Sequence, residues 1–251
     1  MGKEKYKHPI IIIYDFDGVI INSKGADLAA YAQMIDEDIN WNLNELKGLN
    51  PMDLIRRFEM GDNPEGTIQT VRAIFKKFAD LIPNPFKRAK FLIKMGSSVR
   101  NIEYQRSDFI EGIPEVLKKV HNAGIIQGIC TNSEGERLPN WLKAKNCEEY
   151  ISGYTSRNDR HKYGIKPDPR AILHLVLMLK KKHNLGPIDR SLVYFCGDNV
   201  TDIWAAQNAR IKSIAVLSGH GTNDELAFLN ADYVLNSIND LFIIPEIAEY
   251  C

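Results

Sequence analysis

Short apolar runs alternate with helical patterns along most of the chain, and this alternation constrains the fold more than any other feature of the sequence. The expected strands lie at 10–14, 125–131, 151–154, 192–196, 213–217 and 233–235. The expected helices lie at 113–122, 134–144, 169–183, 201–208, 224–230 and 238–249. Strands that alternate with helices in this way form parallel sheets. The sequence therefore predicts an α/β fold with a doubly wound parallel sheet.

One long stretch, residues 24–106, contains helical patterns but no segment that resembles a strand. Its helical patterns are separated by glycine and proline residues, which end helices. Because the stretch follows the first strand directly, we expect an all-helical module that is joined to the rest of the chain by two connections. The predicted division is an α/β core from residues 1–23 and 107–251, and a helical module from residues 24–106.

Composition and charge exclude several classes of protein. The 251 residues include 32 basic and 32 acidic ones, so no net charge favours nucleic acid or an anionic membrane as a partner. No apolar run approaches the length of a membrane span. The four cysteines are widely spaced and form no CxxC pair, which favours free thiols. We therefore expect a cytoplasmic protein, monomeric or a small homo-oligomer.

Two carboxylates stand at the end of the first predicted strand, where the apolar run 10–14 is followed by Asp-Phe-Asp-Gly-Val at 15–19. Open α/β sheets bind ligands outside the carboxyl ends of their strands, so Asp15 and Asp17 lie where a site is expected. Two like charges this close are unfavourable unless a cation or a proton lies between them. The pair therefore indicates chemistry more than an ordinary turn.

Three further predicted strands also end in polar residues. The second ends in Thr131-Asn132-Ser133, a turn that can offer a hydroxyl and backbone N–H groups to an anion. The third is followed by Lys166, in a stiff segment rich in glycine and proline. The fourth is followed by Asp198 and, one helical turn later, Asp202. Each signal has an ordinary structural explanation, namely a helix cap, a solvated lysine or acidic residues at a helix start.

The order of these features is more informative than any one of them. Parallel strands end at one edge of a sheet, so the four polar segments converge there. Oxygen ligands without histidine or cysteine suit Mg²⁺. Mg²⁺ beside a lysine and N–H donors suits a phosphoryl group, with a carboxylate as its covalent acceptor.

These motifs resemble those of the haloacid dehalogenase-like superfamily. Within it the chain resembles the phosphatase branch, which has a helical cap inserted after the first strand, and is similar to phosphoglycolate phosphatase-like proteins. The resemblance covers essentially the whole chain. It includes residues 110–114, which resemble the segment that leads from the cap back to the core, and the pattern at 231–235 near the end of the chain. It implies a Mg²⁺-dependent phosphatase that acts on a small phosphorylated metabolite.

The resemblance also implies a role for each site residue. Asp15 is expected to be the nucleophile, and Asp17 the general acid and base. Mg²⁺ is expected to bind Asp15, the backbone carbonyl of Asp17, and Asp198.

The remaining roles concern the phosphoryl group. Thr131 and the backbone N–H of Asn132 are expected to bind its oxygens, and Lys166 to neutralise its charge. Asp202 is expected to act from outside the direct metal ligands, by orienting Lys166 or a metal-bound water.

Two alternatives remain open at this stage. A phosphosugar mutase uses the same core, although Pro51 stands about where a mutase carries arginine in its cap loop. A non-catalytic scaffold that keeps the fold is the other alternative. The basic cluster Arg157, Arg160, His161 and Lys162 is a candidate for binding an additional anionic group of the substrate.

Overall fold

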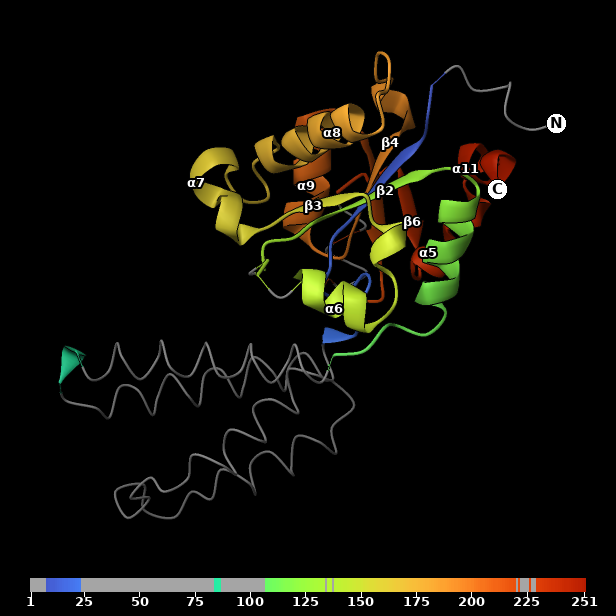
Figure 1. Ribbon diagram of the computed structural model, residues 1–251. Helices are drawn as coiled ribbons and strands as arrows, with labels where there is room; N and C mark the ends of the chain where they lie inside the picture. Colours follow the sequence, from blue (N-terminus) through green and yellow to red (C-terminus); the bar gives the residue numbers. More distant parts are fainter. Residues whose placement is uncertain are drawn as a thin grey trace. The chain divides into compact units, whose positions relative to one another are not determined.

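The computed structural model describes residues 8–23, 84–86, 107–133, 135–136, 138–219, 221, 226 and 229–251 (Figure 1). The chain divides into two compact units, one formed by Met1–Asn22 with Phe109–Cys251 and the other by Ser23–Asp108. Nearly all of the predicted cap, including Pro51, lies outside the described residues. Its helical character therefore stays a prediction, and the first unit is described by itself below.

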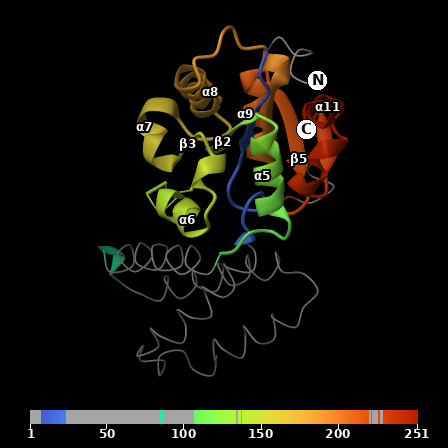
Figure 2. The ribbon, with the colours of Figure 1, turned by 45° about the vertical axis from the view of Figure 1, so that its right-hand side comes forward.

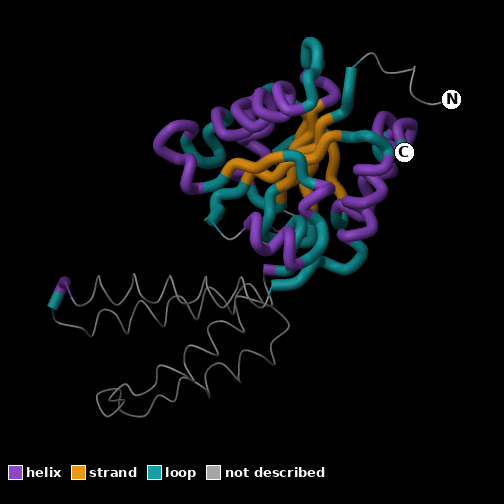
Figure 3. Tube along the Cα trace, viewed as in Figure 1, coloured by secondary structure: helices purple, strands orange, loops and turns teal. Residues whose placement is uncertain are grey.

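The first unit is built on a six-stranded sheet with the strand order β3-β2-β1-β4-β5-β6. All five strand pairs are parallel, which confirms the predicted α/β fold. The strands are β1 (Ile11–Tyr14), β2 (Ile126–Cys130), β3 (Gly153–Thr155), β4 (Val193–Gly197), β5 (Lys212–Val216) and β6 (Tyr233–Leu235). From β1 the chain adds β2 and β3 on one side of the sheet, and then β4, β5 and β6 on the other side of β1. The strands occupy the middle of the unit (Figure 3).

Helices cover both faces of this sheet (Figure 2). On one face, α8 (Arg170–Lys182) and α9 (Val200–Ala209) pack against Ile11, Ile13 and Phe195 in a buried cluster. On the other face, α5 (Ile113–Asn122) packs against β2 and against the 3₁₀ helix η5 (Ile238–Ile243). With both faces covered, central strands such as β1 are fully buried, which is why they read as continuous apolar runs.

Shorter helices complete the unit. They are α6 (Leu138–Ala144), η2 (Glu148–Tyr150), η3 (Arg157–Asp159), α7 (Arg160–Tyr163), η4 (Arg190–Leu192) and α11 (Pro245–Tyr250).

The register of the central strands brings their ends to one level. Tyr14, the last residue of β1, pairs with Ile129 of β2 and with Cys196 of β4. The ladder extends past β1, since the Asp15 N–H donates to the Cys196 carbonyl at 2.8 Å. The residues that follow β1, β2 and β4 therefore lie side by side at the carboxyl edge of the sheet.

Two helix predictions need correction. The single helix expected at 238–249 is two elements, η5 and α11, separated at Ile244, which is extended. Pro245 explains the break, because a residue before proline avoids the helical region and proline suits the first position of a new helix. The helix expected from 134 begins at Leu138, after a turn at Gly135 and Glu136. The helix expected at 224–230 lies largely outside the described residues.

Two expectations based on composition can be compared with the structure. All four cysteines are free thiols, and three of them are buried. Within the described part of the chain, no helix is long and apolar enough to cross a membrane.

Candidate active site

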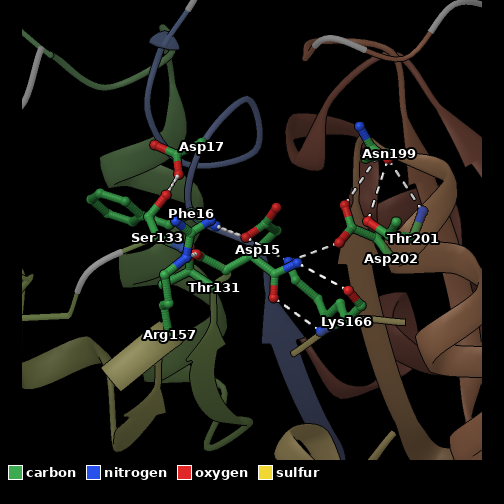
Figure 4. Close-up of polar contacts among 11 residues, drawn as sticks. Asp15, Phe16, Asp17, Thr131, Ser133, Arg157, Lys166, Asn199, Thr201 and Asp202 are labelled. Atoms are coloured by element: carbon green, nitrogen blue, oxygen red, sulfur yellow. Dashed lines mark hydrogen bonds and ion pairs between the residues drawn. The ribbon is translucent and has the colours of Figure 1, made fainter. Parts of the chain in front are cut away.

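The turn after β1 directs its two aspartates to different partners (Figure 4). Asp15 Oδ1 accepts a hydrogen bond from the Phe16 N–H at 2.7 Å and lies 2.8 Å from Lys166 Nζ. Asp17 Oδ2 accepts instead from the Ser133 hydroxyl at 2.5 Å. The Phe16 side chain between them is fully buried and packs edge-on against Trp141, with ring centroids 5.0 Å apart. The packing of Phe16 anchors the turn. The two carboxylates have different surroundings, because Asp15 contacts an ammonium and Asp17 contacts a hydroxyl.

Lys166 is buried rather than solvated, with only 3% of its surface exposed. Its ammonium lies between two carboxylates, 2.8 Å from Asp15 Oδ1 and 2.7 Å from Asp202 Oδ1. The Asn132 side chain fixes the backbone here: its amide N–H donates to the Lys166 carbonyl at 3.1 Å, and its oxygen accepts from the Lys166 N–H at 3.0 Å. The turn after β2 therefore holds the lysine in place.

Burial and neighbouring charges shift the pKa values of Lys166 and Asp202 in opposite directions. Burial lowers the pKa of Lys166, but the attraction of Asp15 and Asp202 outweighs it and holds the pKa above its ordinary value. Burial is the largest influence on Asp202 and raises its pKa to about 6, with Lys166 opposing the rise and Asp15 adding to it. The ammonium therefore stays charged within a crowded group of carboxylates.

Asp202 occupies the first turn of α9 and also caps that helix. Its Oδ2 accepts from the Asn199 N–H at 3.0 Å, while the Asn199 side chain accepts from the Thr201 N–H at 3.2 Å. This reciprocal arrangement is a capping box, which fixes the orientation of the Asp202 carboxylate. One oxygen therefore caps the helix while the other contacts Lys166.

Asp198 is enclosed by glycines from two other loops. A Cβ atom added at Gly18 would lie 2.5 Å from Asp198 Oδ2, and one added at Gly219 would lie 1.9 Å from the same atom. Gly18 has a φ of 76°, a conformation that glycine adopts without strain. The Gly221 N–H donates to the Asp198 carbonyl at 3.0 Å, and the Ser218 hydroxyl donates to the Gly18 carbonyl at 2.8 Å. The loop after β5 thus contributes to the site.

Three buried carboxylates form a cluster able to hold a cation. Asp15, Asp198 and Asp202 each offer an oxygen, and these oxygens lie within 4.8 Å of one another. Such oxygens suit Mg²⁺, and the cluster holds three formal negative charges for the single ammonium of Lys166. The donor set therefore fits the divalent cation predicted from the sequence.

The turn after β2 faces the same edge of the sheet. The Thr131 N–H donates to the Thr155 carbonyl at 3.0 Å, and Thr131 Oγ1 accepts from the Ser133 N–H at 3.0 Å. A hydroxyl that accepts in this way keeps its own proton for donation. Arg157 also holds the turn, since its Nε donates to the Asn132 carbonyl at 2.6 Å. With this carbonyl already bonded to Arg157, the turn can present its remaining donors to an anion.

All seven residues predicted from the sequence lie in this first unit, and Asp15, Asp198, Asp202 and Lys166 are in one cluster. The sequence reasoning missed three contributions: the Ser133 contact to Asp17, the Arg157 contact to the turn, and the glycines around Asp198. A usable signal existed for the glycines, because Gly219 and Gly221 closely follow a predicted strand.

The enclosure of Asp198 leads to a testable expectation. Gly219→Ala should displace the Asp198 carboxylate, because the added methyl carbon would fall within 2.3 Å of the Asp198 Cβ as well as against its oxygen. We expect the dissociation constant of the carboxylate cluster for Mg²⁺ to rise by about tenfold, a loss of roughly 1.4 kcal/mol of binding free energy. Gly186→Ala is the matched control, since a Cβ there meets nothing within 4 Å. Equal dissociation constants for Mg²⁺ in the two variants would refute the proposed enclosure.

Comparisons with known proteins show a family and several relatives. The family model described as haloacid dehalogenase-like hydrolase matches residues 12–216. The phosphoglycolate phosphatase of Vibrio vulnificus (strain CMCP6) is 28% identical over 132 residues, covering 51% of this chain and 53% of that protein. The N-acetylmuramic acid 6-phosphate phosphatase of Pseudomonas aeruginosa is 30% identical over 142 residues, covering 54% of this chain and 57% of that protein. The chain thus spans about half the length of these relatives.

A solved structure extends the likeness in fold. The crystal structure of a predicted phosphoglycolate phosphatase from Haemophilus somnus superposes with a TM-score of 0.65 at 18% identity, over 93% of this chain and 96% of that one. At this identity the likeness concerns the fold alone.

Proposed function

The chain belongs to the family of haloacid dehalogenase-like hydrolases, and from this membership we propose that it is a Mg²⁺-dependent phosphatase that hydrolyses a small phosphomonoester through a phosphoryl group carried on Asp15. The observation that carries the proposal is the unequal setting of the two aspartates. Asp15 lies beside a buried ammonium and in the carboxylate cluster, whereas the Asp17 carboxylate contacts a hydroxyl. A nucleophile and a proton donor need surroundings that differ in this way.

In the first step, Asp15 attacks phosphorus. Its Oδ1 is engaged by the Phe16 N–H and by Lys166, so we assign the attack to Oδ2. A bond forms between Oδ2 and phosphorus while the bond from phosphorus to the leaving oxygen breaks. The protonated Asp17 gives its proton to that oxygen, which leaves as an alcohol. Thr131 and the Asn132 N–H hold phosphoryl oxygens, and Lys166 offsets their charge.

In the second step, water attacks the same phosphorus. Asp17, now a carboxylate, takes a proton from the water as the new bond forms. The bond from Asp15 Oδ2 to phosphorus breaks, which releases inorganic phosphate and restores the free carboxylate. Splitting the hydrolysis in two lets one carboxyl group serve as acid and then as base.

The metal would be held by the carboxylates of Asp15 and Asp198 and by the backbone carbonyl of Asp17. Asp202 supports the site by holding Lys166 at 2.7 Å and by fixing the start of α9. When bound, Mg²⁺ supplies positive charge that stabilises the phosphoryl oxygens.

The substrate is proposed as a class only, a small phosphorylated metabolite. The relatives carry names for different substrates, phosphoglycolate in one and N-acetylmuramic acid 6-phosphate in the other. We therefore propose that the shared core provides the chemistry and that the predicted cap at 24–106 selects the leaving group.

The proposed function is tested by phosphate release from an aryl phosphate with Mg²⁺ and with a chelator. We expect chelation to abolish release and added Mg²⁺ to restore it. Mg²⁺ should also raise the thermal unfolding midpoint, because a ligand that binds only the folded state stabilises it. This rise should be lost in Asp198→Asn and kept in Asp189→Asn, a control that changes an exposed aspartate. Release that persists in chelator would contradict the proposal.

A further inference from the structure

Ser133 links the proposed acid and base to the turn that receives the phosphoryl group. Its hydroxyl donates to Asp17 Oδ2 at 2.5 Å, although the two residues are 116 positions apart in the chain. Figure 4 shows the Asp17 carboxylate directed to Ser133, while the Asp15 carboxylate is directed to Lys166. The contact thus holds Asp17 on the side of the turn after β2.

The backbone of Ser133 is itself held from two sides. Its N–H donates to Thr131 Oγ1 at 3.0 Å, and its carbonyl accepts from the Arg157 N–H at 3.0 Å. Arg157 also donates from Nε to the preceding carbonyl, that of Asn132, at 2.6 Å. These three bonds hold the backbone of the turn, and the hydrogen bond to Asp17 directs the Ser133 hydroxyl.

We propose that Ser133 is a positioning residue that holds the Asp17 carboxyl group at the leaving oxygen of the substrate. The inference rests on the proposed function and extends it to a residue that the mechanism above does not use. Thr131, Asn132 and Ser133 belong to one turn. The same rigid segment would therefore hold both the phosphoryl oxygens and the proton donor Asp17. A hydroxyl both donates and accepts, so the contact survives when Asp17 gains or loses its proton.

Positioning of a proton donor predicts a dependence on the leaving group. The leaving group of an alkyl phosphate is a strongly basic alkoxide unless its oxygen is protonated, so hydrolysis of this substrate needs Asp17 in place. The leaving group of p-nitrophenyl phosphate is a weakly basic phenolate, which hardly needs a proton. The ratio of kcat/KM for the two substrates therefore reports proton donation in the first step. Direct binding of phosphoryl oxygens would affect both substrates alike.

The test compares Ser133→Ala and Ser133→Thr with the parent chain on both substrates at one pH. We expect Ser133→Ala to lower kcat/KM about tenfold or more for the alkyl phosphate and less than about threefold for the aryl phosphate, because misplacing the acid loses part of the roughly 10²–10⁴-fold that general acid catalysis contributes. Ser133→Thr keeps the hydroxyl and should retain most of the activity. Ser191→Ala is the matched control, since it removes an exposed serine–aspartate hydrogen bond of 2.7 Å and should change neither value.

A double variant separates this inference from the proposed function. Asp17→Asn should itself lower the alkyl-to-aryl ratio, and adding Ser133→Ala should cause no further loss, because residues that act as one unit are not additive. An unchanged ratio in Asp17→Asn would overturn the acid role of Asp17. A changed ratio there, with equal losses for both substrates in Ser133→Ala or a further loss in the double variant, would overturn the role of Ser133 alone.

Discussion

Asp15→Asn is expected to lower phosphate release about a thousandfold or more, which is the scale of loss seen when an enzyme loses its nucleophile. An amide of nearly the same size can still accept the Phe16 N–H bond that Oδ1 now receives at 2.7 Å. It has no carboxylate oxygen with which to attack phosphorus, so the proposed covalent intermediate cannot form. The substitution therefore removes the chemistry while preserving the shape of the turn.

Two measurements check this expectation. Phosphate release from an aryl phosphate gives the rate, and the mass of rapidly quenched enzyme is expected to show a phosphoryl adduct in the parent chain and none in Asp15→Asn. Asp189→Asn is the control and should behave as the parent does. If Asp15→Asn kept more than about a tenth of the activity, far above the residual rate expected without the nucleophile, Asp15 would not be the phosphoryl acceptor.

Lys166→Met is expected to lower the free energy of unfolding by about 3–5 kcal/mol, the usual cost of removing one partner from a buried ion pair. Lys166 is 3% exposed and its ammonium contacts Asp15 and Asp202, so its loss leaves buried carboxylates without their counter-charge. Methionine fills the space of the apolar stem, so the loss measures charge more than packing. Denaturant unfolding in chelator gives the value without a contribution from bound cation.

A second substitution and a matched control make this prediction specific. Asp202→Asn added to Lys166→Met should recover part of the lost stability, because it removes one of the carboxylates left behind. Lys212→Met breaks an ion pair of the same 2.7 Å length that is about one-third exposed, and should cost about 1 kcal/mol or less. Equal losses in Lys166→Met and Lys212→Met would show that the buried pair contributes no more than a surface one.

The elements of the core could be predicted where local pattern and burial agree. The strand at 233–235 and the helix at 113–122 have the predicted bounds, and the other five strands differ by one or two residues at one or both ends. The prediction failed at 238–249, where hydrophobic spacing favoured one helix and the backbone restriction before Pro245 prevailed. Local steric rules outweighed periodicity at that point.

The contacts of individual side chains were less accessible from the sequence. A lysine in a loop is normally solvated, and only the folded chain reveals that Lys166 is enclosed between two carboxylates. The orientation of Asp17 toward Ser133 has no local signature either, and the position of Gly219 and Gly221 after a predicted strand does not reveal that they enclose Asp198. These contacts join loops that follow different strands, so sequence spacing carries little information about them.

The sequence by itself determined the parallel sheet and the order of its polar strand ends, because burial on both faces requires continuous apolar strands and parallel strands end at one edge. Only the tertiary structure decided which groups meet at that edge. The pairing of Lys166 with Asp15 and Asp202, and of Ser133 with Asp17, depends on strand register and on rigid turns. The physical reason is that the apolar pattern of a strand depends on neighbouring residues in the sequence. The partner of a buried charge depends instead on how segments far apart in the sequence pack together.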